Sequence, residues 1–235
     1  MQLFFNPNIN SKTQTFTFDK EESRHIVKAL RKKEGDILSI TNGLGFLFSS
    51  EIINLNDKKC SVQIISFEEI KKPWNYHLHI AIAPTKMNER FAWFLEKSTE
   101  IGIDEITPII CENSERKVFK KERMQKVIVS AAKQSLKFTF PKLNDPIKLS
   151  DFMSKVDAEI KLIAHCEDSK KNSLMKVIKT KKDILVLIGP EGDFSVKEIS
   201  KALQHQYIPL SLGKSRLRTE TAGLVTCSTI SVINE

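Results

Sequence analysis

Hydrophobic and polar positions alternate along the first 70 residues in short runs that favour β-strands. Five such runs, rich in β-branched and aromatic side chains, lie at 3–5, 15–18, 36–41, 47–55 and 60–67. Asn42-Gly43, between the third and fourth runs, is a strong hairpin-turn signal. A helix is expected at 20–33, where Asp19 can cap the first turn and Glu22 can complete a capping box. The pattern predicts a small, mainly β domain with one helix.

The pattern changes after residue 75, where apolar strands begin to alternate with amphipathic helices. The predicted strands are 76–83, 105–110, 160–166, 183–189 and 207–213, and the predicted helices are 88–102, 122–138, 172–180, 195–204 and 219–233. Asn88 is a possible helix cap, Gly102 is a stop signal, and Ser195 with Glu198 makes a capping box. Such alternation is typical of an α/β domain with a mostly parallel sheet.

The stretch "KKPWN", residues 71–75, separates the two patterns and is the best linker candidate. It holds two lysines, a proline and an asparagine, which suit an exposed connection. We therefore predict two domains, 1–72 and 73–235.

Composition indicates a soluble globular protein. The chain has 235 residues, of which 40% are hydrophobic and 28% charged, and no apolar run approaches the roughly 20 residues that span a bilayer. The first ten residues lack the features of a signal peptide, so we expect a cytoplasmic protein. The four cysteines, Cys60, Cys111, Cys166 and Cys227, are widely spaced. They are expected to be buried thiols, and no metal site is predicted.

The formal net charge of +8 favours an anionic partner, and the excess is local. Residues 112–148 carry ten Lys or Arg side chains and only four Asp or Glu. Two interpretations stay open for this basic segment: a nucleic-acid contact, or a solvated lysine-rich helix face.

The chemistry is predicted at two loops that follow successive strands, "IGPEGDFS" at 188–195 and "LGKSRLRTET" at 212–221. Gly189, Gly192 and Gly213 would let the backbone approach a ligand at the carboxyl ends of parallel strands. Neither loop matches a phosphate-binding signature, and Glu191 and Asp193 would repel a pyrophosphate. The loops suit a ligand that is not polyanionic and carries positive charge. S-adenosylmethionine, with its sulfonium and its amine, has these properties.

Several of these stretches together resemble one known family. "IGPEGDFS", "LGKSRLRTETA" and "ERFAWFLEKSTEIGIDEITPI", with "HIVKALRKKEGDILSITNG" near the start, resemble the ribosomal RNA small-subunit methyltransferase E family. Members of that family are 16S ribosomal RNA (uracil-N3) methyltransferases of the SPOUT superfamily. The resemblance covers nearly the whole chain. One departure is Asp193, where the family commonly has glycine or another small residue.

The resemblance implies a fold and an assembly that the pattern alone did not give. The fold would be a small N-terminal PUA-like, RNA-binding β-barrel domain followed by a C-terminal SPOUT α/β domain with a trefoil knot. S-adenosylmethionine would lie bent in the knot, and the active unit would be a homodimer that acts on 16S ribosomal RNA of the small ribosomal subunit.

The resemblance also implies sites. The cofactor-binding residues would be Ile188, Gly189, Pro190, Glu191, Gly192, Leu212, Gly213, Leu217, Thr221 and Ala222. The candidate catalytic residues are Glu191, Arg218 and Glu220, and the candidate RNA-binding residues are Arg31, Arg116, Lys117, Lys120 and Lys121. Thr219 is expected to cap the last helix with its hydroxyl, with Glu220 in the first turn.

The expected reaction is S-adenosylmethionine-dependent methylation of N3 of a uridine. Uracil N3 must lose a proton, either to a general base or with its anion stabilised by nearby cations. Two alternatives stay open. One is another SPOUT specificity, such as 2′-O-ribose or a different base. The other is a non-catalytic RNA-binding protein that uses the β domain and the basic segment.

Overall fold

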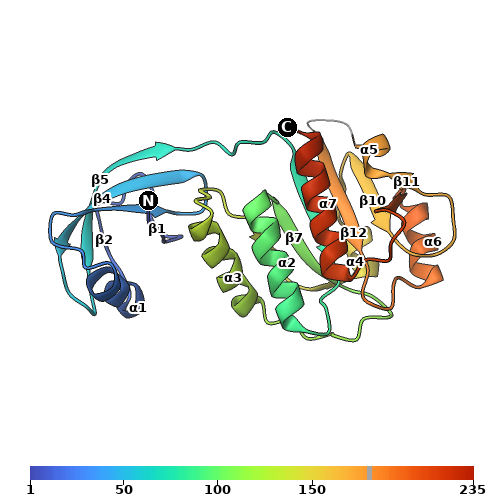
Figure 1. The fold of residues 1–235 in the computed structure, drawn as a ribbon, viewed down its shortest axis with the longest axis horizontal. Helices are drawn as coiled ribbons and strands as arrows, with labels where there is room; N and C mark the ends of the chain where they lie inside the picture. The colour runs from blue at the N-terminus through green and yellow to red at the C-terminus, as the bar shows by residue number, and fades with distance from the viewer. Residues whose placement is uncertain (179–181) are drawn as a thin grey trace. The chain divides into compact units, whose positions relative to one another are not determined.

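The computed structural model describes residues 1–178 and 182–235, and these residues form two compact units (Figure 1). The first unit consists of Met1–Lys72 together with Ala132–Phe140. The second consists of Pro73–Ala131 together with Pro141–Glu235. Among the described residues, no helix is long and apolar enough to cross a membrane.

The first unit is a five-stranded sheet with one short helix, as the alternation predicted. Its strands are β1 (Leu3–Phe5), β2 (Thr15–Thr17), β3 (Ile37–Thr41), β4 (Phe46–Asn54) and β5 (Ser61–Glu69), in the order β1-β3-β4-β5-β2. Only the β1–β3 pairing among them is parallel. The inward-facing side chains, including Phe4, Ile40 and Phe48, form a closed apolar core. The predicted hairpin at Asn42-Gly43 joins β3 to β4, and Gly43 has φ +75°.

The helix of this unit is shorter than predicted and ends in a π turn. It runs as α1 (Lys20–Arg24) and then η1 (His25–Ala29). Arg31, with φ +52°, terminates it in the left-handed conformation. Asp19 caps α1 by accepting a hydrogen bond from the backbone N–H of Glu22 at 2.8 Å. The capping-box role predicted for Glu22 is wrong, because its carboxylate accepts a hydrogen bond from Lys133 instead.

Residues 132–140 belong to the first unit although the pattern assigned them to the second domain. The ring of Phe140 stacks on Phe5 at 4.7 Å between centroids. The backbone of this segment also bonds to the β3–β4 turn, for example from Gly45 N to Phe138 O at 2.9 Å. The preceding helix, α3 (Lys121–Gln134), ends before the predicted residue 138 because Leu136 adopts φ +53°.

The second unit is built on an eight-stranded sheet in which every pairing is parallel. The strands are β6 (His77–Ile82), β7 (Glu105–Ile110), β8 (Lys142–Leu143), β9 (Ile147–Lys148), β10 (Ile160–Ala164), β11 (Asn172–Ser173), β12 (Asp183–Ile188) and β13 (Ile208–Ser211). Their order is β11-β13-β10-β12-β6-β7-β8, and β9 pairs with β7. The predicted α/β fold with a mostly parallel sheet is confirmed. The trefoil knot stays a prediction.

Helices cover both faces of this sheet. On one face, α2 (Asn88–Ile101), α3 and α7 (Thr219–Ile233) pack on Leu78, Ile80 and Ile82 of β6. On the other, α4 (Leu149–Met153) and α6 (Val196–Gln204) pack on Leu185 and Leu187 of β12. Because side chains alternate along each strand, β12, which is apolar after Asp183, serves both cores.

Some of the predicted helix caps and helix ends are observed in the second unit, and others are not. Ser195 and Glu198 form the complete capping box predicted for α6, and Gly102 with φ +124° ends α2. Asn88 is not a cap, because it is the first helical residue, and Met87 at the cap position makes no side-chain bond. The helix predicted at 172–180 is only α5 (Leu174–Val177), preceded by β11. Residues 179 and 180 of that prediction lie outside the described residues. The pattern missed β8, β9 and α4.

Candidate functional site

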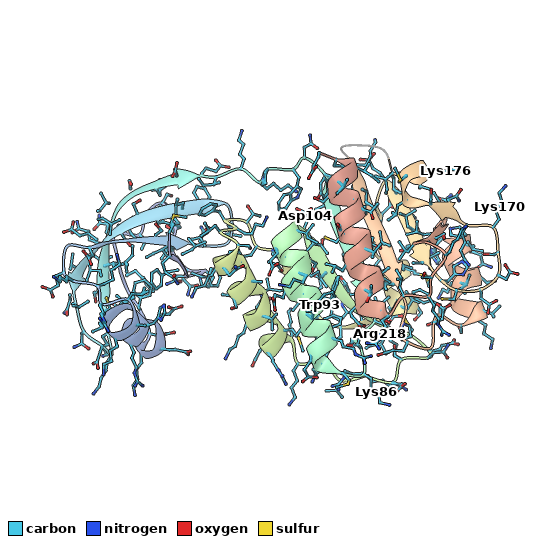
Figure 2. The ribbon with its side chains drawn as sticks, viewed as in Figure 1. Lys86, Trp93, Asp104, Lys170, Lys176 and Arg218 are labelled. Atoms are coloured by element: carbon cyan, nitrogen blue, oxygen red, sulfur yellow. The ribbon has the colours of Figure 1, made fainter. Side chains whose placement is uncertain are left out.

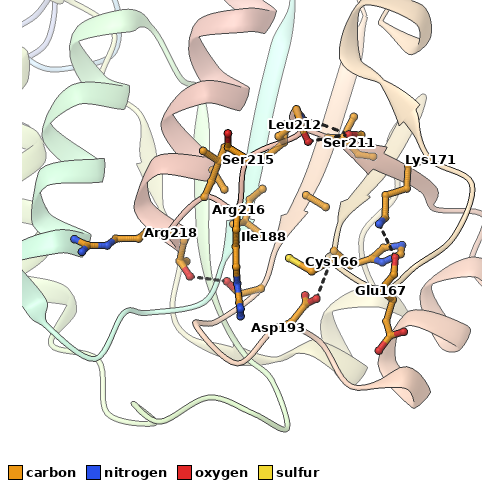
Figure 3. A pocket seen from close by; sticks show the side chains of 18 of the residues that line it. Cys166, Glu167, Lys171, Ile188, Asp193, Ser211, Leu212, Ser215, Arg216 and Arg218 are labelled. Carbon is orange, nitrogen blue, oxygen red and sulfur yellow. Dashed lines mark hydrogen bonds between the residues drawn. The ribbon is translucent and has the colours of Figure 1, made fainter.

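A cavity of about 920 Å³ opens at the carboxyl ends of three neighbouring strands, β13, β10 and β12 (Figure 3). Its wall consists of the loops that follow these strands, residues 164–168, 188–191 with Asp193, and 210–219, together with Lys171 and Ala222. This edge of an open parallel sheet is where ligands bind, because strand ends present unpaired backbone groups and loops of free sequence. The two loops predicted from their glycines therefore share one cavity.

Most of the residues predicted to hold the cofactor line this cavity. They are Ile188, Gly189, Pro190, Glu191, Leu212, Gly213, Leu217 and Ala222. Gly192 and Thr221 are not in its wall. Gly192 instead packs against Asn113, which donates a hydrogen bond to its carbonyl at 3.2 Å.

Gly213 has the backbone that the prediction required. Its φ of +126° is one that residues with a Cβ rarely adopt, and a Cβ at this position would meet no atom of the described residues within 4 Å. The residue is exposed on the cavity wall. Gly213 therefore leaves open space beside its backbone at the cavity wall.

Glu191 holds a neighbouring loop as well as lining the cavity. Its Oε1 accepts a hydrogen bond from the backbone N–H of Lys86 at 2.9 Å. Arg116 binds the same loop, donating from Nε to the carbonyls of Thr85 at 3.1 Å and Lys86 at 3.0 Å. These two side chains fix the connection between β6 and α2 beside the cavity.

The start of α7 is tied directly to the loop after β12. The cap role predicted for Thr219 is wrong, because Arg218 occupies the cap position and Thr219 is the first helical residue. The Thr219 hydroxyl donates instead to the Gly189 carbonyl at 3.0 Å, which joins the two predicted loops. Glu220 lies in the first turn as predicted, where the positive end of the helix dipole favours a carboxylate.

The side chain of Glu220 is buried and does not line the cavity. It is 7% exposed, and its Oε1 lies 3.8 Å from Nε of Arg90 on α2. Within the described residues, its Oε2 has no hydrogen-bond partner. Arg218 differs from it, because it is exposed on the cavity wall and extends toward α2 (Figures 2 and 3).

The sequence reasoning missed the loop after β10. His165, Cys166, Glu167 and Asp168 line the cavity, but they contain no glycine, and the first two fell inside a predicted strand. Cys166 is exposed, so the prediction of a buried thiol is wrong there, whereas Cys60, Cys111 and Cys227 are buried. Burial lowers the pKa of His165, and the Lys171 charge lowers it further, so its imidazole is neutral at pH 7.

Charges on the cavity wall are balanced in number. Acidic side chains are Glu167, Asp168, Glu191 and Asp193, and basic side chains are Lys171, Lys214, Arg216 and Arg218. A polyanion would meet four carboxylates here. A ligand with charges of both signs could pair with groups of opposite sign on the wall.

The predicted basic cluster divides into engaged and exposed cations. Arg116 is bound to backbone carbonyls as described, and Lys121 pairs with Asp145 at 3.0 Å. Lys117 and Lys120 are exposed. Arg31, in the first unit, ends the π turn of η1.

A second polar cluster lies at the opposite edge of the sheet, where β6, β7 and β12 begin. His79 bonds to Thr107 at 2.7 Å, and Asn144 bonds to Thr107 at 2.7 Å and to Glu105 at 2.6 Å. Burial lowers the pKa of His79 to about 4. Because these groups bond to one another, the cluster is best explained as a structural network. No group of three or more His, Cys, Asp or Glu in the described parts of the chain is arranged to hold a metal ion.

Comparisons with known proteins agree with this architecture. Residues 72–231 match the RNA methyltransferase domain family, and residues 18–65 match the RNA methyltransferase PUA domain family. The protein named Ribosomal RNA small subunit methyltransferase E of Buchnera aphidicola (subsp. Acyrthosiphon pisum) is 32% identical over 231 residues. The match spans 93% of this chain and 88% of that protein.

Solved structures extend the similarity to the whole chain. A probable rRNA-methyltransferase of Porphyromonas gingivalis has a TM-score of 0.94 and 40% identity, covering 100% of this chain and 98% of that one. A putative methyltransferase of Legionella pneumophila, solved with its cofactor SAM bound, has a TM-score of 0.87 and 30% identity. It covers 99% of this chain and 97% of that one.

Proposed function

The chain belongs to the ribosomal RNA small subunit methyltransferase E family, and from that premise we propose that it methylates N3 of a uridine in 16S ribosomal RNA with S-adenosylmethionine as methyl donor. The observation that carries this proposal is the cavity at the ends of β13, β10 and β12, in which both predicted glycine loops meet. Its wall of mixed charge suits a ligand that carries an amine, a carboxylate and a sulfonium.

The residues present fit that ligand. Gly189, Leu212 and Leu217 offer backbone groups and apolar surface suited to an adenine, and Gly213 leaves room for close approach. The carboxylates of the wall suit the cationic groups, and Lys171, Lys214 and Arg216 suit the carboxylate. When bound, S-adenosylmethionine supplies an electrophilic methyl group on its sulfonium.

Methylation of uracil N3 also requires that N3 lose its proton. We assign anion stabilisation to Arg218, because it is a cation exposed at the cavity. Glu191 and Glu220 are the proposed proton acceptors: Glu191 lines the cavity, and Oε2 of Glu220 has no hydrogen-bond partner among the described residues. Of the variants Glu191→Gln and Glu220→Gln, the one that loses the methyl-transfer rate while keeping cofactor affinity identifies the acceptor.

The direct test is transfer of labelled methyl groups from S-adenosylmethionine to small ribosomal subunits that lack the modification. Labelled 16S ribosomal RNA supports the proposal. Cofactor binding without transfer to any RNA would favour the alternative of a non-catalytic RNA-binding protein.

RNA binding is proposed for Lys117, Lys120, Lys121, Arg116 and Arg31, with the exposed lysines contributing most. Each lost phosphate contact lowers the slope of log affinity against log salt by about one unit. The double variant Lys117→Gln with Lys120→Gln should therefore lower the slope by about two and weaken all RNA sequences alike. Filter binding at several salt concentrations measures this slope.

Lys121→Gln is the matched control for this prediction. Its ammonium already pairs with Asp145, so its loss should change the slope less. A double variant with the wild-type slope would make Lys117 and Lys120 part of an ordinary solvated surface.

We also propose a homodimer that covers the outer side of α7. Residues 221–234 contain no Asp, Glu, Lys or Arg, yet Val232 is 64% exposed, and on the neighbouring α2 Trp93 is 41% exposed (Figure 2). Exposed apolar surface of this kind often marks a protein–protein interface. Light scattering should give twice the chain mass of 26.8 kDa, and Val232→Glu should shift the protein to monomer. A monomeric wild type at micromolar concentration would contradict the dimer.

A further inference from the structure

The loop after β10 forms the middle of the cavity wall, because β10 lies between β13 and β12 in the sheet. Unlike its two neighbours, this loop contains no glycine at residues 164–168. Its position against the ligand must therefore come from contacts with the loops beside it.

One such contact comes from the side chain of Asp193, on the loop after β12 (Figure 3). Its Oδ2 accepts a hydrogen bond from the backbone N–H of Cys166 at 2.6 Å, and its Oδ1 accepts one from Phe194 N at 2.8 Å. Hydrogen bonds to an ionised carboxylate are about twice as strong as those between neutral groups. The carboxylate thus joins the middle loop to the loop after β12.

The backbone of Asp193 is fixed independently from the other side. Its N–H donates to the Pro190 carbonyl at 2.9 Å, closing a tight turn. Asn113, on the loop after β7, donates to the Asp193 carbonyl at 3.1 Å. The carboxylate therefore extends from an anchored turn, which makes it a rigid support for Cys166.

The backbone conformation of Asp193 is one that glycine would adopt at a lower energetic cost than aspartate. Its φ is +61°, a left-handed value that glycine adopts freely and that costs other residues roughly 1–2 kcal/mol. The two hydrogen bonds of the carboxylate offset that cost, whereas a glycine would make neither.

We propose that Asp193 is a positioning residue, which docks the loop after β10 as the middle wall of the cavity and so sets the affinity for the cofactor. This inference rests on the proposed function for the identity of the ligand. The competing explanation is that the carboxylate acts on the ligand directly, by attracting the positive sulfonium.

Two variants and two ligands separate these explanations. Asp193→Gly suits the φ angle but removes both side-chain bonds, whereas Asp193→Asn keeps an acceptor oxygen for Cys166 N–H and removes the charge. S-adenosylhomocysteine has no sulfonium charge. If Asp193 positions the loop, calorimetry should show Asp193→Gly weakening both ligands equally, by about tenfold, and Asp193→Asn weakening both equally and less.

Cys166 provides a readout that needs no ligand. It is the exposed cysteine, and the other three are buried, so a thiol reagent applied to the folded protein reports on this loop. In Asp193→Gly the Cys166 thiol should react faster and its backbone amide should exchange hydrogen faster. The melting temperature should not fall, because glycine suits the angle.

The outcomes are distinct. Wild-type affinity in Asp193→Gly, or unchanged thiol reactivity and amide exchange, would overturn the positioning role. A loss in Asp193→Asn confined to S-adenosylmethionine would also overturn it, in favour of direct charge attraction. If wild-type protein bound neither ligand but the Cys166 readouts changed as expected, the docking would stand and the proposed function would fail.

Discussion

The Gly213→Val variant is expected to bind S-adenosylmethionine at least a hundredfold more weakly than wild type, a loss of about 2.7 kcal/mol. Gly213 lies on the wall of the proposed cofactor cavity with φ +126°, and within the described part of the chain no atom lies within 4 Å of where its Cβ would be. A valine would place a branched side chain in that space and strain the loop by roughly 1–3 kcal/mol. Calorimetry measures the affinity, and circular dichroism should stay near wild type because the loop is exposed.

Gly35→Val is the matched control for backbone strain. Gly35 has φ +86° and only a distant neighbour, Glu51 Oε1 at 3.9 Å, but it lies in the N-terminal unit. The Gly35→Val variant should lower the melting temperature by a few degrees and leave cofactor affinity unchanged. Undiminished binding in Gly213→Val would put the cofactor site elsewhere, and equal losses in both variants would trace the effect to general destabilisation.

The order of elements could be predicted because hydrophobic periodicity reports burial directly. The run 183–189 is apolar at nearly every position, and the strand it predicted, β12, packs against helices on both of its faces. Part of the cavity could also be predicted from the sequence, because Gly189 and Gly213 follow strand ends, where the sheet topology brings loops together.

Contacts that depend on tertiary packing could not be predicted from local signals. Thr219 has the residue type of a helix cap, yet its hydroxyl bonds to Gly189, 30 residues earlier in the chain. The loop at His165 and Cys166 carries no glycine or motif, so nothing local distinguished it from the strand before it. Its place in the cavity follows from β10 lying between β13 and β12.

The density of basic residues in the sequence was an incomplete guide to RNA-binding residues, because it too does not report tertiary contacts. The segment 112–148 carries ten basic side chains, but Arg116 holds backbone carbonyls and Lys121 pairs with Asp145. Counting cations therefore overstates the number available to RNA. Which lysines are exposed depends on partners far along the chain.

The modified nucleoside itself is the last expected result. A cell without this protein should lose one N3-methyluridine from its 16S ribosomal RNA, and purified protein with S-adenosylmethionine and unmodified small subunits should restore it. Particles should be better substrates than naked RNA, because an assembled surface can present a uridine already splayed for edge contacts. Nucleoside mass spectrometry decides the outcome, since N3-methyluridine, C5-methyluridine and 2′-O-methyluridine share a mass but separate by chromatography. A 2′-O-methyluridine product would contradict the uracil-N3 specificity, but it would still agree with the fold and with the proposed cofactor cavity.

The uracil-N3 specificity depends on deprotonating N3. Arg218→Ala should therefore slow the methyl transfer by 10²-fold or more, the size typical of losing one stabilising group, without removing cofactor binding.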